Sequence, residues 1–189
     1  MGKIVHLGVA IPLVGGAVLG AVAGRADAWV EVRPDVRIDG ATAEQVELAQ
    51  WAVGRFDAWG LKAPPVEIRF HGDPGGCGGR LGYAESGRVD VCTTLVNVMT
   101  RRILLHEMAH IWLDVNTDAA VRERFMELRG LRAWNASTDP WERRGYEQGA
   151  EVISWAIGER ILGAQVSDND PEALEAGFEI LTGIAPPRA

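Results

Sequence analysis

Alternation of apolar and polar residues predicts β-strands in three parts of the chain. In residues 29–38 every second position is apolar apart from an interruption at Pro34, which predicts an early strand broken at that residue. Residues 66–70 alternate without a break and predict a second strand. Residues 82–91 alternate on both sides of a Ser-Gly pair, a pattern typical of a β-hairpin.

Apolar residues spaced by three and four predict helices in the rest of the chain. One helix follows Thr42, which forms a capping box with Gln45, and another begins at Asp170-Pro171, with aspartate as the N-cap. The first helix is expected to run to about Trp59, and three further helices are predicted over residues 98–114, 118–131 and 145–162. Because most helices follow the strands instead of alternating with them, we predict an α+β fold.

Composition narrows the class of protein. The chain has 189 residues, of which 47% are hydrophobic and 24% are charged, as expected for one globular domain. Its formal net charge of −7 argues against a nucleic-acid binder, because little positive charge is available to neutralise phosphates.

The first 28 residues have the pattern of a signal peptide. Lys3 supplies a positive start, residues 4–24 contain no charged side chain, and Ala26-Asp27-Ala28 matches a cleavage site. We therefore expect a secreted protein whose single domain spans residues 29–189, with no stable membrane association after cleavage. The alternative is an uncleaved membrane anchor, because the apolar run is long enough to span a bilayer.

The sequence contains two cysteines, Cys77 and Cys92, on either side of the predicted hairpin. In an oxidising compartment an even pair favours a disulfide, which would close a loop of about 15 residues and stabilise the fold by about 3 kcal/mol. Two separate buried thiols are the alternative. A metal site made of this pair is disfavoured, because the spacing is not that of a zinc knuckle.

The run His106-Glu107-Met108-Ala109-His110 carries the candidate chemistry. On a helix, His106 and His110 lie one turn apart on the same face, so that both imidazoles can bind one zinc ion. Glu107 adjoins that face and can reach a water molecule on the metal. The alternative is a pair of hydrogen-bonded histidines in a buried helix without metal.

A third ligand is expected from the predicted helix 145–162. Glu147 and Glu151 share one polar stripe of this otherwise apolar helix, and buried carboxylates are costly unless a cation or a donor faces them. Helical geometry alone allows either residue to bind zinc. Tyr146 is a weaker candidate for stabilising an oxyanion, and His71 is expected at the surface, with a substrate contact as its alternative.

The segment from Leu104 to Trp112 resembles the active-site helix of the zincin metallopeptidases. No third histidine follows His110, as a metzincin would require, so the resemblance is to the gluzincins, the thermolysin-like group whose third ligand is a glutamate on a later helix. It implies a minimal zincin-like domain, with a helix, a small sheet and a hairpin before the active-site helix and helices after it. The chain is also similar to small exported bacterial proteins of the metallopeptidase type.

This resemblance also implies roles for the two acidic residues. The pattern Glu147 to Glu151 resembles the gluzincin element N-E-x-x-S-D, in which the first acid binds zinc and the second orients a ligand histidine. Glu147 and Ala150 also resemble the element E-x-x-A of small antirepressor-cleaving zincins. The resemblance therefore implies that Glu147 is the ligand and Glu151 the acceptor that orients a histidine. The implied activity is hydrolysis of peptide or protein substrates, with Glu107 as general base.

Two other functions stay open from the sequence. One is a secreted zincin-like binding module that keeps zinc without turnover, and the other is an extracellular α+β domain without metal. The sequence does not indicate the substrate preference or the oligomeric state.

Overall fold

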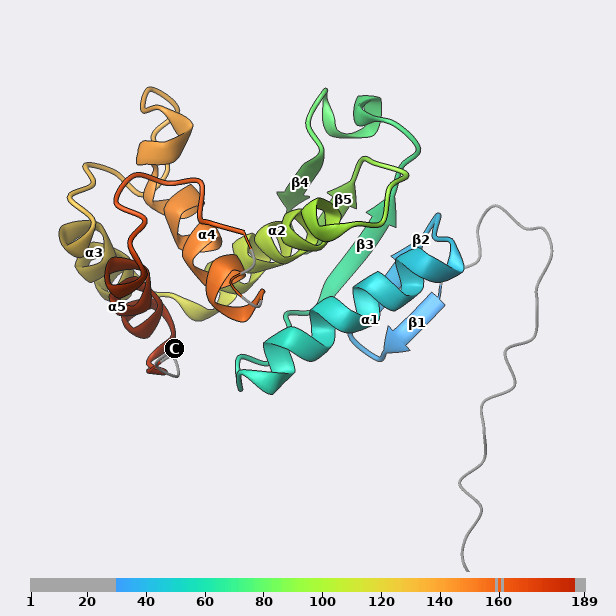
Figure 1. Ribbon diagram of the computed structural model, residues 1–189, viewed down its shortest axis with the longest axis horizontal. Coiled ribbons are helices and arrows are strands. Elements are labelled where there is room, and N and C mark those ends of the chain that lie inside the picture. Colours follow the sequence, from blue (N-terminus) through green and yellow to red (C-terminus); the bar gives the residue numbers. More distant parts are fainter. Residues whose placement is uncertain (1–29, 159, 161, 186–189) are drawn as a thin grey trace, which may run out of the picture.

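The computed structural model describes residues 30–158, 160 and 162–185 (Figure 1). Within them the chain forms five α-helices and one five-stranded mixed sheet, which confirms the predicted α+β class. The predicted signal peptide and its cleavage site lie outside the described residues. The elements are β1 (Val30–Arg33), β2 (Val36–Asp39), α1 (Ala43–Ala58), β3 (Val66–Phe70), η1 (Pro74–Cys77), β4 (Gly82–Glu85), β5 (Arg88–Val91), α2 (Val98–Asn116), α3 (Ala119–Leu128), η2 (Trp141–Arg143), α4 (Gly145–Ile157) and α5 (Pro171–Thr182).

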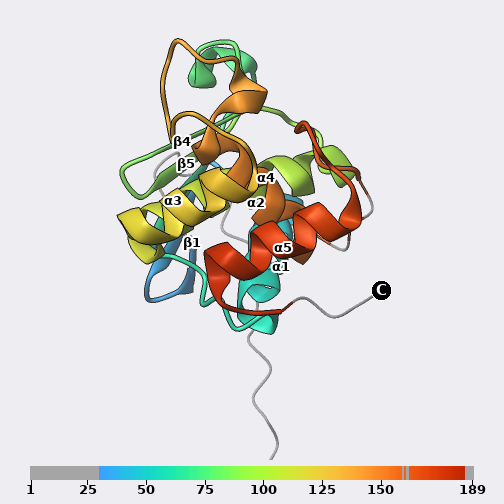
Figure 2. The ribbon, with the colours of Figure 1, turned by 90° about the vertical axis from the view of Figure 1, so that its left-hand side faces the viewer.

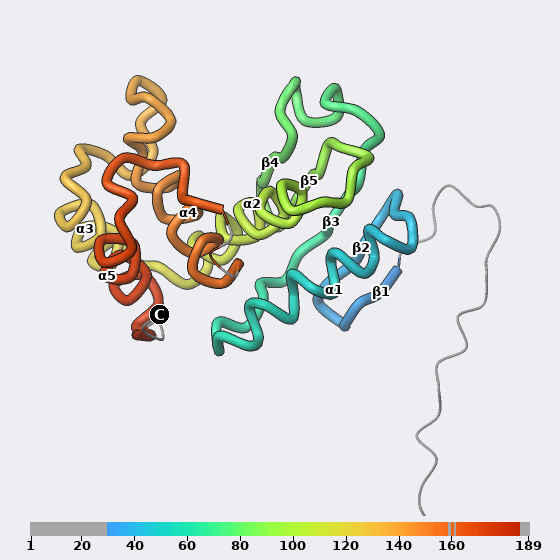
Figure 3. Tube along the Cα trace, in the orientation of Figure 1, coloured from blue at the N-terminus to red at the C-terminus, as the bar shows by residue number. Residues whose placement is uncertain are grey.

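The sheet has the strand order β1-β2-β3-β5-β4. The single strand predicted over residues 29–38 is instead two antiparallel strands, β1 and β2, because the chain turns back at Pro34 and Asp35. The hairpin predicted over residues 82–91 is confirmed as β4 and β5. The central pairs, β2 with β3 and β3 with β5, are parallel. This order leaves β4 at one edge of the sheet, beside α2 (Figure 3).

The two faces of the sheet differ in composition because side chains alternate along each strand. The inner face is apolar and buried, and the helices α1 and α2 belong to the same core. The opposite face carries charged residues, and the register aligns them in one row across all five strands: Glu31, Arg37, Glu67, Arg88 and Glu85. Opposite charges on neighbouring strands stabilise such pairs.

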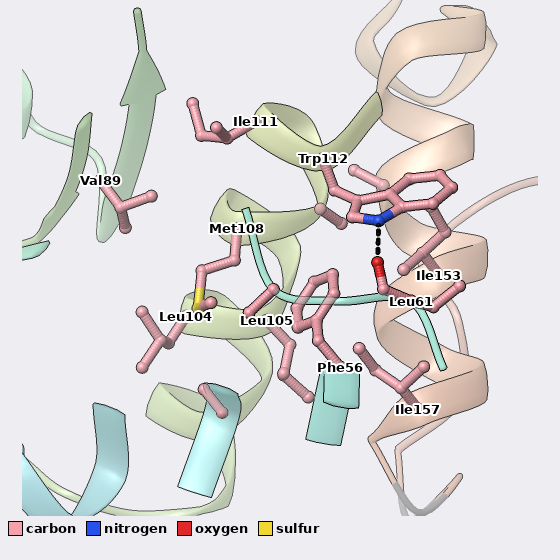
Figure 4. Close-up of a cluster of buried hydrophobic side chains, with 14 of the residues drawn as sticks. Phe56, Leu61, Val89, Leu104, Leu105, Met108, Ile111, Trp112, Ile153 and Ile157 are labelled. Carbon is pink, nitrogen blue, oxygen red and sulfur yellow. Dashed lines mark hydrogen bonds between the residues drawn. The ribbon is translucent and has the colours of Figure 1, made fainter. Parts of the chain in front are cut away.

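The helix α2 packs between the sheet and α4 (Figure 4). Leu104 and Met108 point toward Val89 of β5, while Trp112 lies toward α4 and donates an indole hydrogen bond of 2.8 Å to the carbonyl of Leu61. These side chains are at most 5% exposed. The core therefore fixes the rotation of α2 about its axis, and with it the direction of its opposite face.

The helices α3, α4 and α5 form the second half of the described chain, and α3 and α5 lie side by side (Figure 2). The predicted helix 145–162 was too long, because α4 ends at Ile157 and Gly158 donates the closing bond to the Ser154 carbonyl. Arg160 adopts a positive φ of 55°, a left-handed conformation that a right-handed helix does not contain, so the helix has ended before this residue. The helix predicted to reach residue 131 also ends early, at Leu128.

A disulfide joins Cys77, in η1, to Cys92, which follows β5, as the sequence predicted. The closed loop contains the whole β4–β5 hairpin. It also contains a backbone bond of 2.8 Å from the Cys92 N–H to the Leu81 carbonyl, which extends the pairing of the two strands. The disulfide therefore ties the segment before β4 to the end of β5, at the open end of the hairpin.

Candidate metal centre

The histidines of α2 converge on one point. Asn97 caps the helix by accepting from the N–H groups of Met99 and Thr100, and the apolar face described above leaves His106 and His110 on the side toward α4. Both histidines are buried, and their Nε2 atoms lie 3.0 Å apart. One turn of helix is thus the spacing that aims both rings at a common point.

Glu147, in the first turn of α4, completes a triangle with these two nitrogens. Its Oε2 atom lies 3.3 Å from Nε2 of His106 and 3.1 Å from Nε2 of His110. Zinc bonds of about 2.0–2.1 Å in a tetrahedron put neighbouring ligand atoms about 3.3 Å apart. The three side chains therefore have both the donor types and the spacing to hold a zinc ion.

Glu151 lies one turn further along α4 and faces the other side of the first histidine. Its Oε1 atom is 3.1 Å from Nδ1 of His106, at ion-pair distance but without the alignment of a full hydrogen bond. Its Oε2 atom accepts from Arg102 and, at 2.9 Å, from the N–H of Gln165. The side chain is only 4% exposed, so these groups, rather than bulk solvent, balance its charge.

Glu107 lies in the same cleft as the two histidines, beneath the start of β4. A Cβ atom added to Gly82 would lie 2.6 Å from its Oε1 atom and 2.6 Å from Cγ2 of Ile103. The absence of a side chain at Gly82 is thus what allows the edge strand to approach the carboxylate this closely. Burial raises the pKa of Glu107 to about 7, although the nearby His106 opposes that shift.

The carboxylates and imidazoles of the cluster strongly shift one another's pKa values. Burial alone would lower the pKa of His106, but the nearby carboxylates of Glu147 and Glu151 raise it to about 9. Burial would raise the pKa of Glu147, but the two histidines hold it well below its usual range. Burial lowers the pKa of His110. The cluster therefore combines a carboxylate, Glu147, that favours its ionised form with one imidazole, His110, that favours its neutral form.

Two aromatic rings flank the histidines. The ring of Tyr146 lies 4.2 Å from that of His110, and Trp141 stacks on His106 at 5.8 Å between centroids. The Tyr146 hydroxyl donates to Asp114 at 2.9 Å, and burial, together with that carboxylate, raises the pKa of Tyr146 far above its usual range. The hydroxyl is therefore a fixed donor, already engaged by a neighbour.

These groups open into a cleft of about 740 Å³, a size typical of ligand sites. Its floor is α2, one wall is β4 with the residues just before it, and the other wall is α4 with the loop that contains η2. In Figures 1 and 2 the loops around η1 and η2 project on the same side of α2, one from each half of the molecule.

The structure brings most of the candidate residues from the sequence into this cleft. Glu107, the two histidines, Glu147 and Glu151 line this cleft together, as does Tyr146. His71 does not line it: its Nε2 atom lies 2.7 Å from Oδ1 of the buried Asp90, on the outer face of the sheet. Sequence reasoning missed Arg102 and Trp141.

Arg102 lies one turn before His106, so helical spacing was a usable signal for it. The loop that carries Trp141 to the site has no such periodicity.

Neither a scan against protein-family models nor searches of curated proteins and of solved structures gives a match to this chain. Among the described residues, no helix has an apolar stretch that could cross a bilayer.

Proposed function

We propose that the protein is a zinc-dependent metallopeptidase of minimal gluzincin type, with zinc held by His106, His110 and Glu147. The observation that carries this proposal is the convergence of three ligand atoms from two helices, each within 3.3 Å of the others. Two imidazoles and a carboxylate form one of the ligand sets found in catalytic zinc sites. Three protein ligands leave the fourth position of the metal open for water or substrate.

Glu107 is the proposed general base. Zinc at this site would supply a Lewis acid for the peptide carbonyl and an activated water. The Glu107 carboxylate takes a proton from the attacking water and passes it to the leaving amine. A pKa of about 7, raised by burial, suits a group that must accept and then release a proton near neutral pH.

A peptide in extended conformation is the proposed substrate. β4 is an edge strand and lines the cleft, so its outer backbone groups are available to pair with an added strand. Such pairing would hold the main chain of a peptide across the histidines. This geometry supports a peptide or protein substrate that is bound through its main chain. The residues of the cleft walls would then select among the side chains of the substrate.

We also propose that the protein is exported. The proposal rests on the signal-peptide pattern of residues 1–28. The disulfide between Cys77 and Cys92 supports it, because disulfides persist mainly in oxidising compartments.

The test is metal analysis of the full protein produced in an exporting bacterial host, followed by turnover of a mixed peptide library. We expect one zinc per chain, cleavage that a zinc chelator abolishes, and recovery when zinc is added back. A protein without stoichiometric zinc would contradict the metal site. One zinc per chain without cleavage would favour the alternative, a zinc-holding binding module.

A further inference from the structure

Arg102 is a third basic group that α2 supplies to the site, besides His106 and His110. It lies four residues before His106, hence on the same face of the helix, and its side chain is 14% exposed. Its guanidinium donates from Nη2 to Oε2 of Glu151. The histidine and the arginine of one helix thus contact the same carboxylate of another.

The two oxygens of the Glu151 carboxylate have different partners. Oε1 faces the Nδ1 atom of His106, while Oε2 accepts from Arg102 and from the N–H of Gln165. Two donors on one oxygen fix the rotation of the carboxylate about its last bond. The Gln165 donor is a backbone N–H in the loop that follows α4, so its position is set by the path of the main chain.

We propose that Arg102 is a positioning residue of the zinc site: it holds Glu151 against Nδ1 of His106, and so turns Nε2 of that ring toward His110 and Glu147. This inference rests on the proposed function, because it presupposes zinc at the cluster. A carboxylate on the far nitrogen of a ligating histidine fixes both the tautomer and the orientation of the ring. Arg102 acts on the histidine indirectly, through its contact with Glu151.

A direct contact with substrate is the competing role for Arg102, since the residue lines the cleft. Its guanidinium, however, is largely buried and already paired with a carboxylate. It also lines a second, small cavity of about 30 Å³, together with Trp51 and Trp155. This arrangement suits a fixed support better than a group that must reorganise around a ligand.

The sign of the charge effect makes the inference testable. Removing the positive charge of Arg102 would by itself strengthen the binding of a divalent cation nearby. Losing the orientation of Glu151 should weaken it, by about tenfold, the lower end of the range for partners of ligating histidines. A loss of affinity in Arg102→Met therefore reports positioning and cannot come from the charge.

The experiment measures zinc affinity against a competing chelator for the wild type, Arg102→Met, Arg102→Lys and the neighbouring control Arg101→Met. Arg101 lies over the Trp51 ring, at 5.1 Å from its centroid, and does not line the cleft. We expect about tenfold weaker binding in Arg102→Met, partial recovery in Arg102→Lys, which keeps a donor, and no change in the control. The visible spectrum of the Co²⁺-loaded protein should change only in the Arg102 variants.

Zinc affinity and Co²⁺ spectrum equal to wild type in Arg102→Met would overturn the inference and leave the proposed function intact. A wild type that does not bind zinc would overturn both. If Arg102→Met does not fold, as judged by circular dichroism, Arg102→Gln provides the same comparison with a polar side chain. A lowered affinity for acidic peptides alone, with unchanged zinc binding, would assign Arg102 to the substrate instead.

Discussion

Gly82 lies directly against the carboxylate of Glu107, so close that a methyl group on Gly82 would be 2.6 Å from Oε1. The contact joins the edge strand β4 to the helix that carries both histidines. The φ of Gly82 is not in the left-handed region, so any residue could adopt its backbone conformation. Glycine is needed at this position because a side chain would collide with Glu107. The position of the proposed general base thus depends on a residue 25 positions earlier in the chain.

Replacing Gly82 with alanine should displace Glu107 and leave the zinc ligands in place. We expect peptide turnover to fall at least about tenfold, zinc affinity to change less than about threefold, and stability to fall by about 1–3 kcal/mol from overpacking against Ile103. Gly72→Ala is the matched control, because a Cβ there has no neighbour within 4 Å. Unchanged turnover in Gly82→Ala would show that the contact does not set the position of Glu107.

Glu107→Gln should keep zinc and lose hydrolysis. The amide has nearly the same shape as the carboxylate but cannot accept the proton, and general-base catalysis contributes about 10²–10⁴-fold in rate. The measurement is turnover of a peptide that the wild type cleaves, together with zinc content. Equal rates in the two proteins would remove Glu107 from the mechanism.

The two acidic residues of α4 should differ in their effect on zinc. Glu147→Ala removes a proposed ligand and should leave the protein largely without zinc. Glu151→Ala should lower zinc affinity by about 10–100-fold, so that its site still fills at high zinc concentration. Competition with a chelator compares the two variants, and Glu142→Ala, an exposed acid of η2, is the control. A lower zinc content in Glu151→Ala than in Glu147→Ala would reverse the two roles.

The disulfide should be detectable in exported protein and should contribute to stability. We expect no free thiol in the denatured, unreduced chain, and a loss of about 3 kcal/mol of unfolding free energy in the double variant Cys77→Ser, Cys92→Ser, because the closed loop restricts the unfolded chain. Thiol titration and chemical denaturation test the two parts. Two titratable thiols in protein from an oxidising compartment would contradict the first.

Local signals in the sequence were enough to predict most of the elements. The Thr42–Gln45 capping box and the Asp170 N-cap depend on contacts within four residues, and both occur as predicted. The early end of α4 was missed because apolar periodicity continues past Ile157, whereas Gly158 and the loop after it set the boundary. Sequence periodicity predicts faces of helices better than their ends.

For the candidate site, helical spacing predicted which residues share a face, whereas the meeting of the two faces was implied only by the resemblance to the gluzincins. The one-turn spacing of His106 and His110, and of Glu147 and Glu151, followed from helical geometry. That Glu147 faces the Nε2 atoms and Glu151 the Nδ1 atom depends on how α4 packs against α2. Trp141 reaches the site through a loop, whose path is determined by tertiary contacts.

The charges on the outer face of the sheet bear on how the strands find their alignment during folding. A slip of one residue would turn the apolar side chains of a strand to the outer face. A slip of two would keep the faces but bring like charges together, for example Arg37 opposite Arg69 or Glu67 opposite Asp90, where the native alignment pairs Arg37 with Glu67 and Arg69 with Asp90. Both kinds of misalignment are penalised, so the charged face encodes the native register of the parallel strands.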